Sequence, residues 1–264
     1  MHRVKVRVVE DALDANNTIA RANRADFDRA GVTVVNLMSA PGAGKTTLLE
    51  RLLGGDDGGA GGLGGPGGPR VGVLEGDVQG SLDADRLAHL HVPVVQLNTD
   101  SGFGGECHLD ANMVRSALPA LPLEQIDLLI VENVGNLVCP AEFHVGEDAR
   151  IMVSSVAEGD DKPLKYPLMF RTCELVVLNK VDLIEHVDFD LDRFAARLDA
   201  VHPGVALMPV SARTGEGLDE LRAWLASVPE RKARAAAVPP AAAPPAAAPP
   251  AAAPAAPAPA GGAV

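Results

Sequence analysis

The segment SAPGAGKTT, from Ser39 to Thr47, has the residue types of a phosphate-binding loop. It lies between the apolar run VTVVNLM and the helix-like stretch TTLLERLL, which is the strand-to-helix context that such a loop needs. In such a loop glycines let backbone N–H groups surround phosphate oxygens, the lysine reaches the β- and γ-phosphates, and the hydroxyl binds Mg²⁺. Ser39 stands where the usual pattern has its first glycine. The predicted phosphate contacts are Gly42, Ala43, Gly44, Lys45, Thr46 and Thr47.

A second polar segment, Asn179 to Asp182 (NKVD), follows the apolar run ELVVL. An aspartate here can accept hydrogen bonds from N1–H and the 2-amino group of guanine, which adenine lacks, and an unpaired buried carboxylate is costly. Ser211-Ala212-Arg213 follows VALMPV, where a backbone N–H can meet the guanine oxygen. The order of these segments after the phosphate loop predicts GTP and GDP as ligands. The predicted base contacts are Asn179, Lys180, Asp182, Ser211 and Ala212.

Two acidic positions follow other apolar runs and fit a nucleotide switch. Asp77 comes after VGVL and is predicted to hold Mg²⁺ together with Thr46. Glu132 and Gly135 follow DLLIV and are predicted to sense the γ-phosphate. A solvated loop acid is the alternative for each carboxylate. The predicted catalytic set is Lys45, Thr46, Asp77 and Glu132.

The thiols and one imidazole form a third group of residues that could do chemistry. Cys107 and His108 are adjacent, and Cys139 lies four residues beyond Gly135. Soft thiolates and imidazole suit Ni²⁺ or Zn²⁺, but the sequence has neither a C-x-x-C pair nor an obvious fourth ligand, so spacing alone leaves a metal site open. Three ligands would leave a position for water or for a second subunit. Cys173 precedes an apolar run and is expected to be buried.

These segments need a framework, and the apolar periodicity predicts one. An amphipathic helix is expected over residues 10–30, ending before Gly31. Short apolar runs that alternate with helix-like stretches predict a mainly parallel central sheet flanked by helices, an α/β fold with its loops at the carboxyl ends of the strands. The expected strands are 32–38, 71–74, 93–97, 127–131, 174–178 and 205–210. The expected helices between them are 45–53, 83–89, 109–118, 188–199 and 217–227.

Composition divides the chain into three parts. We expect an N-terminal helix in residues 1–31, a nucleotide-binding domain in 32–228 and a disordered Ala/Pro-rich tail in 229–264. Within the domain, the glycine-rich residues 54–70 are expected to form a flexible insertion outside the packed core.

Charge and hydropathy exclude some classes of function. The formal net charge of −12 argues against a nonspecific nucleic-acid or anionic-membrane binder. No apolar run approaches the roughly 20 residues that span a bilayer, and the charged N-terminus is unlike a signal peptide. We therefore expect a cytoplasmic protein without membrane or nucleic-acid partners, in which the three cysteines are not a disulfide framework.

Together these residues resemble the HypB family, the nickel-incorporation GTPases of nickel–iron hydrogenase maturation. The likeness runs from about Leu13 to Leu225 and rests on MSAPGAGKTTLL, EGDVQGSLDADR, GGECHLDANMV and VENVGNLVCPAEFHVGE. In that family, serine at the first P-loop position and the glutamate of ENVG are regular features. The resemblance implies a slow, Mg²⁺-dependent GTPase whose nucleotide state is coupled to nickel insertion.

The resemblance also implies a metal site and partners. Cys107, His108 and Cys139 would hold Ni²⁺, or Zn²⁺ in the same place. The implied partners are a second copy of the chain in a nucleotide- or metal-dependent homodimer, a small nickel metallochaperone and the hydrogenase large-subunit precursor. Lys162 and Lys165 are candidates to reach the neighbouring subunit's nucleotide, with a solvated loop as the alternative.

One departure from the family concerns the N-terminus, where residues 1–30 contain no Cys and only one His, His2. A separate tight nickel site of the kind some members carry is therefore not expected. The alternatives are an accessory GTPase for another metalloenzyme such as urease, and a metal-binding module whose GTP site is only structural.

Overall fold

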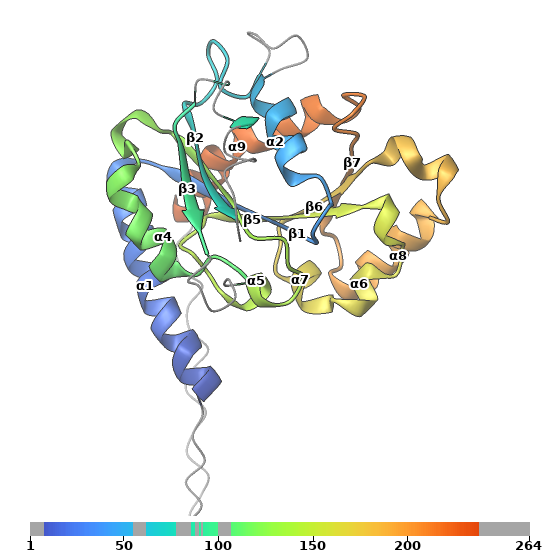
Figure 1. Ribbon diagram of the computed structural model, residues 1–264, viewed down its shortest axis with the longest axis horizontal. Helices are drawn as coiled ribbons and strands as arrows, with labels where there is room; N and C mark the ends of the chain where they lie inside the picture. Colours follow the sequence, from blue (N-terminus) through green and yellow to red (C-terminus); the bar gives the residue numbers. More distant parts are fainter. Residues whose placement is uncertain are drawn as a thin grey trace, which may run out of the picture.

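One seven-stranded sheet of parallel strands forms the centre of the molecule (Figure 1). The computed structural model describes residues 8–54, 62–77, 86–87, 90, 92–99 and 107–237. Its strand order is β3-β2-β4-β1-β5-β6-β7. The strands are β1 (Thr33–Ser39), β2 (Val71–Asp77), β3 (Val94–Asn98), β4 (Leu128–Glu132), β5 (Ala149–Ser155), β6 (Leu175–Asn179) and β7 (Ala206–Pro209).

Helices cover both faces of this sheet. They are α1 (Val8–Ala30), α2 (Lys45–Gly54), α4 (Ala111–Ala117), α5 (Cys139–Glu142), α6 (Lys162–Lys165), α7 (Pro167–Arg171), α8 (Leu191–Val201) and α9 (Leu218–Ala237). The 3₁₀ turns are η1 (Leu118–Ala120), η2 (Leu123–Gln125), η3 (Val156–Glu158) and η4 (Val181–His186). Apolar side chains of α2 and α9 pack on one face, and those of α1, α4, α7 and α8 pack on the other. The predicted α/β class and the N-terminal helix are confirmed.

Alternation along the central strand explains why the sheet is covered twice. In β1, Val35 and Leu37 pack in the cluster under α2 and α9, whereas Val34 packs with the α1 side. All seven residues of β1 are buried. A strand buried on both faces reads as a continuous apolar run, as the sequence predicted.

Register places the polar segments at one edge of the sheet. Leu37 pairs with Glu132, and Ser155 pairs with Asn179, so the carboxyl ends of β1, β4, β5 and β6 lie side by side. Loops that follow these strands therefore converge there, as parallel sheets require.

Among the described residues, no helix is both long and apolar enough to cross a membrane.

The short helices α5, α6 and α7 were not expected from the sequence, and three further elements differ from the expectations. Strand β5, which lies next to the central strand β1, was not predicted, because Arg150 interrupts its apolar run. The last helix continues through Pro229 to Ala237, so the first residues assigned to the tail are helical. Leu63 of the glycine-rich insertion is only 4% exposed and belongs to the core under α2, so part of that insertion is packed. Residues 55–61 and 238–264 lie outside the described residues.

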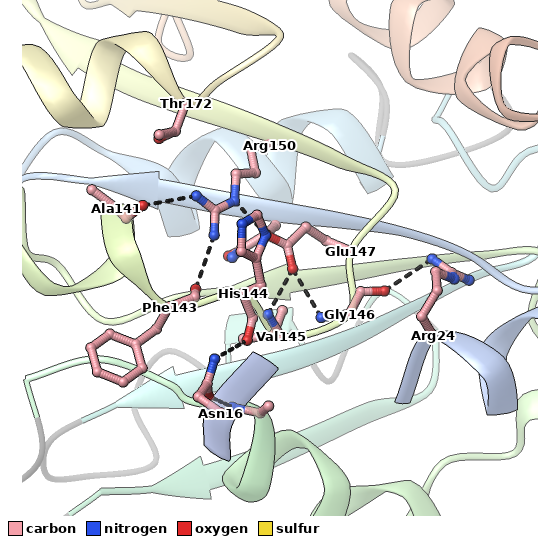
Figure 2. Close-up of polar contacts among 12 residues, drawn as sticks. Asn16, Arg24, Ala141, Phe143, His144, Val145, Gly146, Glu147, Arg150 and Thr172 are labelled. Atoms are coloured by element: carbon pink, nitrogen blue, oxygen red, sulfur yellow. Dashed lines mark hydrogen bonds and ion pairs between the residues drawn. The ribbon is translucent and has the colours of Figure 1, made fainter. Parts of the chain in front are cut away.

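Arg150 is buried in β5 because an acid and two carbonyls surround it (Figure 2). Its guanidinium pairs with Glu147 and donates to the carbonyls of Ala141 and Phe143, each at 3.0 Å. Burial alone would raise the pKa of Glu147, but His144 and Arg150 outweigh it and lower that pKa to about 2. This ion pair fixes the connection between α5 and β5.

Arg150→Leu should lower the free energy of unfolding by about 3–5 kcal/mol, because it leaves the buried Glu147 carboxylate without its cation. Urea denaturation at neutral pH measures this change. Because its folded-state pKa is depressed, Glu147 contributes stability that is complete above the ordinary value of 4.5 and is lost as pH falls toward about 2. The variant should lose the share of this acid sensitivity that Arg150 contributes, while the contact with His144 remains. Arg29→Leu is the control, since Arg29 is 75% exposed and should contribute little.

Candidate functional site

The phosphate-binding loop has the geometry that its residue types predict. Gly42 and Gly44 adopt positive φ angles of 73° and 94°, and a Cβ on Gly44 would lie 2.7 Å from Nδ2 of Asn179. Lys45 opens α2, and its Nζ donates to Oγ of Ser39 at 2.8 Å. Ser39 is fully buried at the end of β1. The serine that replaces the first glycine therefore holds the lysine that would meet the phosphates.

Two buried carboxyl groups line the same cavity as the hydroxyl predicted to bind Mg²⁺. Oγ1 of Thr46 donates to Oε1 of Glu132 at 2.8 Å. Glu75 pairs with Glu132 in the β2–β4 register, and both are less than 5% exposed. Asp77 ends β2 at the same edge, but its side chain lies outside the part described, so its role stays a prediction. From the sequence we predict Asp77 as the acid of β2 that holds Mg²⁺, and Glu75 is given no role.

A cavity of about 580 Å³ opens over the phosphate-binding loop, and its walls include Thr46, Glu75, Glu132, Gly135 and Lys180. The segment after β4 approaches the loop closely here. A Cβ on Gly135 would lie 3.0 Å from both Cα and N of Pro41. This contact explains a glycine at the position predicted to sense the γ-phosphate.

Arg86 lines the same cavity and was not identified from the sequence. Its Nη2 donates to Oγ1 of Thr47 at 3.1 Å, and its guanidinium pairs with Glu50 of α2. The sequence signal was a basic residue ending the acidic run SLDADR, directly before a leucine that turns out to be buried. Arg86 therefore brings a guanidinium, paired with Glu50, to the rim of the cavity over the phosphate-binding loop.

The segments predicted to read guanine meet at the side chain of Asn179. Its Nδ2 donates to the carbonyl of Ala43 at 2.9 Å, and its Oδ1 accepts from the backbone N–H groups of Lys180 at 2.8 Å and Ala212 at 3.1 Å. Nζ of Lys180 donates to the carbonyl of Gly42 at 2.6 Å. The phosphate-binding loop, the NKVD segment and the SAR segment are thus brought together.

The carboxylate predicted to select guanine lies beside these groups. Oδ1 of Asp182 accepts from Oγ of Ser211 at 2.6 Å, and Oδ2 lies 3.7 Å from Nη1 of Arg213. The serine fixes the direction of the carboxylate, which is partly exposed. This arrangement leaves a carboxylate positioned to accept hydrogen bonds from a base.

The two thiols and the imidazole predicted as metal ligands also come together. Sγ of Cys107 lies 3.1 Å from Sγ of Cys139 and 3.7 Å from Nδ1 of His108. One potential ligand atom from each residue lies within 4.8 Å of the others. Ligand atoms about 2.0–2.3 Å from a tetrahedral ion lie roughly 3.3–3.8 Å apart. The cluster therefore needs only small movements to hold a metal ion.

Cys173 is not part of this cluster. It is 1% exposed, and burial raises the pKa of its thiol to about 12. Its Sγ donates to the carbonyl of Phe170. The prediction that Cys173 is a buried residue of the core is confirmed.

Two asparagines tie the metal cluster to the segment that lines the nucleotide cavity. Oδ1 of Asn133 accepts from the backbone N–H of Leu109 at 2.9 Å. Nδ2 of Asn136 donates to the carbonyl of Cys107 at 3.1 Å. Both asparagines flank Gly135, and their roles were missed because their partners lie more than 20 residues away.

The two lysines predicted as candidates for a cross-subunit contact differ in their surroundings. Lys165 pairs with Asp161 at 2.6 Å, whereas Nζ of Lys162 lies 5.4 Å from the centre of the Tyr166 ring. Burial raises the pKa of Glu158 against the opposing charges of Lys162 and other lysines. Which lysine reaches a second subunit stays a prediction.

Comparison with known proteins identifies the family. The sequence model described as "CobW/HypB/UreG, nucleotide-binding domain" matches residues 33–209. The hydrogenase maturation factor HypB of Escherichia coli K12 is 44% identical over 223 residues, which are 84% of this chain and 72% of that protein. The chain belongs to the HypB family.

Solved HypB structures share the fold. The crystal structure of HypB from Helicobacter pylori in complex with nickel is 34% identical, with a TM-score of 0.73, and the match covers 84% of this chain and 96% of that one. HypB from Archaeoglobus fulgidus is 33% identical, with a TM-score of 0.71 over 82% of this chain and 99% of that one. Membership of the HypB family makes this chain a P-loop nucleotide-binding protein of hydrogenase maturation.

Asp182→Asn should weaken GTP binding at least tenfold, about 1.4 kcal/mol or more, and shift preference toward xanthosine triphosphate. The reason is that an amide can donate to the 2-oxo group of xanthine but cannot accept both guanine donors. Fluorescence titration with both nucleotides measures the change. Glu185→Gln, an exposed acid on the same 3₁₀ turn, is the control and should bind GTP normally. Unchanged GTP affinity in Asp182→Asn would contradict the assignment.

Proposed function

We propose that this HypB-family protein hydrolyses GTP and uses its nucleotide state to hold or release Ni²⁺ for the nickel–iron hydrogenase large subunit. One observation carries the proposal: residues 132–139 belong to both sites. Glu132 and Gly135 line the nucleotide cavity, and Cys139 belongs to the thiol cluster. A displacement at one site therefore acts on the other.

The candidate nucleotide site offers several groups that would support phosphoryl transfer. Backbone N–H groups at the start of α2 and the Lys45 ammonium would stabilise charge on the β- and γ-phosphates. Thr46 and Asp77 would hold Mg²⁺, and the buried carboxyl groups of Glu75 and Glu132 line the same cavity as Thr46, so this place is rich in the oxygen ligands that the ion prefers. Mg²⁺ would supply further neutralisation of phosphate charge. Slow turnover is part of the proposal.

The metal cluster fits a transferable ion. Two thiolates and an imidazole suit Ni²⁺ and also Zn²⁺, and the three ligands found among the described residues leave a position open. The crystal structure of HypB from Helicobacter pylori in complex with nickel supports Ni²⁺ as the cargo. Water or a second copy of the chain would complete the coordination.

A homodimer that places two metal clusters together is part of the same proposal. Val138, next to Cys139, is 59% exposed, and Leu164 of α6 and Leu168 of α7 are 54% and 42% exposed. Helices α5, α6 and α7 lie along one side of the molecule (Figure 1). Large exposed apolar side chains near a metal cluster favour a protein contact there. A small metallochaperone and the large-subunit precursor are the further partners we propose.

Nickel affinity should differ by about 5–150-fold between the GDP form and a form with a nonhydrolysable GTP analogue, the usual range for coupled sites. Calorimetric titration of Ni²⁺ into each form, at several protein concentrations, separates this coupling from dimerisation. Single-turnover hydrolysis in the same preparation tests whether the GTP site is more than structural.

The double change Cys107→Ala, Cys139→Ala should abolish this nucleotide dependence and leave GDP affinity nearly unchanged. Cys173→Ala is the matched control, since that thiol is buried away from the cluster. Equal Ni²⁺ affinity in both nucleotide forms, or a coupling that survives loss of both thiols, would contradict the proposed function.

A further inference from the structure

We propose that helix α1 is a brace for the metal cluster, and that Asn16 and Asn23 are positioning residues that set the spacing between its two ligand-bearing segments. This inference rests on the proposed metal site and goes beyond it. One segment carries Cys107 and His108 and continues into α4. The other begins at Cys139, runs through α5 and reaches β5.

Asn16 bridges the two segments with one side chain. Its Oδ1 accepts from the backbone N–H of Ala111 at 2.9 Å, and its Nδ2 donates to the carbonyl of His144 at 2.8 Å. Ala111 lies three residues after His108, and His144 lies five after Cys139. Asn16 is only 6% exposed, so water cannot readily replace either bond.

Asn23 repeats this bridge two helical turns later. Its Nδ2 donates to the carbonyls of Ala111 at 2.8 Å and Val145 at 3.1 Å, and its Oδ1 accepts from Arg115 at 3.1 Å. Asn23 has no exposed surface. A spacing of seven residues puts both asparagines on one face of α1, so the helix holds the two segments along its length.

At Gly146 the connection between α5 and β5 packs directly against the backbone of α1. Gly146 has φ 102°, and a Cβ there would lie 2.8 Å from the carbonyl oxygen of Ala20 and 2.9 Å from Cβ of Asn23. Nη1 of Arg24 also donates to the Gly146 carbonyl at 3.0 Å. Figure 2 shows Asn16 and Arg24 reaching this connection from α1.

The connection transmits the position of α1 to the ligands because it is stiff. Arg150 donates to the carbonyls of Ala141 and Phe143, which are two and four residues after Cys139. The Phe143 ring packs on the His108 ring with centroids 4.3 Å apart. Metal ligands must be placed within about 0.2 Å. A shift of α1 against either segment therefore changes the distance from the Cys139 thiolate to the Cys107 thiolate and the His108 imidazole.

The test uses Co²⁺ alone as the probe, because thiolate ligands give it a charge-transfer absorption band that reports the ligand set. Asn16→Leu should weaken Co²⁺ binding roughly tenfold or more, as loss of groups that orient ligands usually does, and should shift or weaken that band. GDP affinity, measured on the same samples, should stay within about twofold because none of the described α1 side chains lines the nucleotide cavity. Asn17→Leu is the matched control: within the described residues its side chain makes no hydrogen bond.

A second variant reaches the same brace from the other side. Gly146→Ala keeps both asparagines but wedges a Cβ between α1 and the connection, so it should also weaken Co²⁺ binding while GDP affinity is kept. If Asn16→Leu does not fold, the Gly146→Ala variant tests the proposed role of α1 by itself. Unchanged Co²⁺ affinity and an unchanged band in the folded variant would overturn the inference, as would a parallel loss of Co²⁺ and GDP affinity. If instead the unaltered protein shows no thiolate band that Cys139→Ala removes, the proposed metal site itself fails.

Discussion

The buried amide of Asn133 joins three segments on which both candidate sites depend. Its Oδ1 accepts from the N–H groups of Leu109 and Val134, and its Nδ2 donates to Oδ1 of Asn36 in the central strand. Asn133 has no exposed surface, so a broken bond would leave a buried polar group unsatisfied at a cost of about 1–3 kcal/mol. Movement of the segment that lines the nucleotide cavity should therefore carry the Leu109 backbone with it. Leu109 directly follows His108, and our proposal is that the nucleotide acts on the metal cluster through this bond.

A second buried amide, that of Asn179, joins the segments predicted to bind the guanine base. Asn179 connects the P-loop carbonyl of Ala43 with the backbone N–H groups of Lys180 and Ala212. Both amides lie at the carboxyl edge of the parallel sheet, where the loops converge. Residues 134–139 follow β4 and are not part of the sheet, whereas Asn179 ends β6. In our proposal, a change in bound phosphate moves residues 134–139 while the base contacts stay in place.

Local motifs explain how much of the molecule could be predicted from sequence. The phosphate-binding loop, the NKVD and SAR segments and the Cys-His pair depend on neighbouring residues and on the strand before them, so their assembly at one edge followed from the α/β pattern. The strand containing Arg150 was missed because an arginine can be buried there only when Glu147 pairs with it. The sequence alone does not show that these two side chains meet. Leu63 was missed for a similar reason, since a single leucine among glycines gives no periodic signal.

Long-range partners account for the residues that sequence reasoning could not assign. Asn16 and Asn23 read as polar positions on an amphipathic helix, yet their hydrogen-bond partners include residues about 90 to 130 positions away. Arg86 and Glu75 likewise gain a role only when the cavity wall is formed. The chemistry of such residues is clear from their type, but their position in space depends on the whole fold.

The amide hydrogen-exchange rate of Leu109 tests the central claim most directly, because this N–H is the donor to Asn133. NMR-detected exchange should be compared between the GDP form and a form with a nonhydrolysable GTP analogue, without metal. We predict rates that differ at least about fivefold, the lower end of usual coupling between sites, and no such difference in Asn133→Ala. Equal Leu109 exchange in both nucleotide forms of the unaltered protein would show that the nucleotide does not act on the metal cluster through this bond.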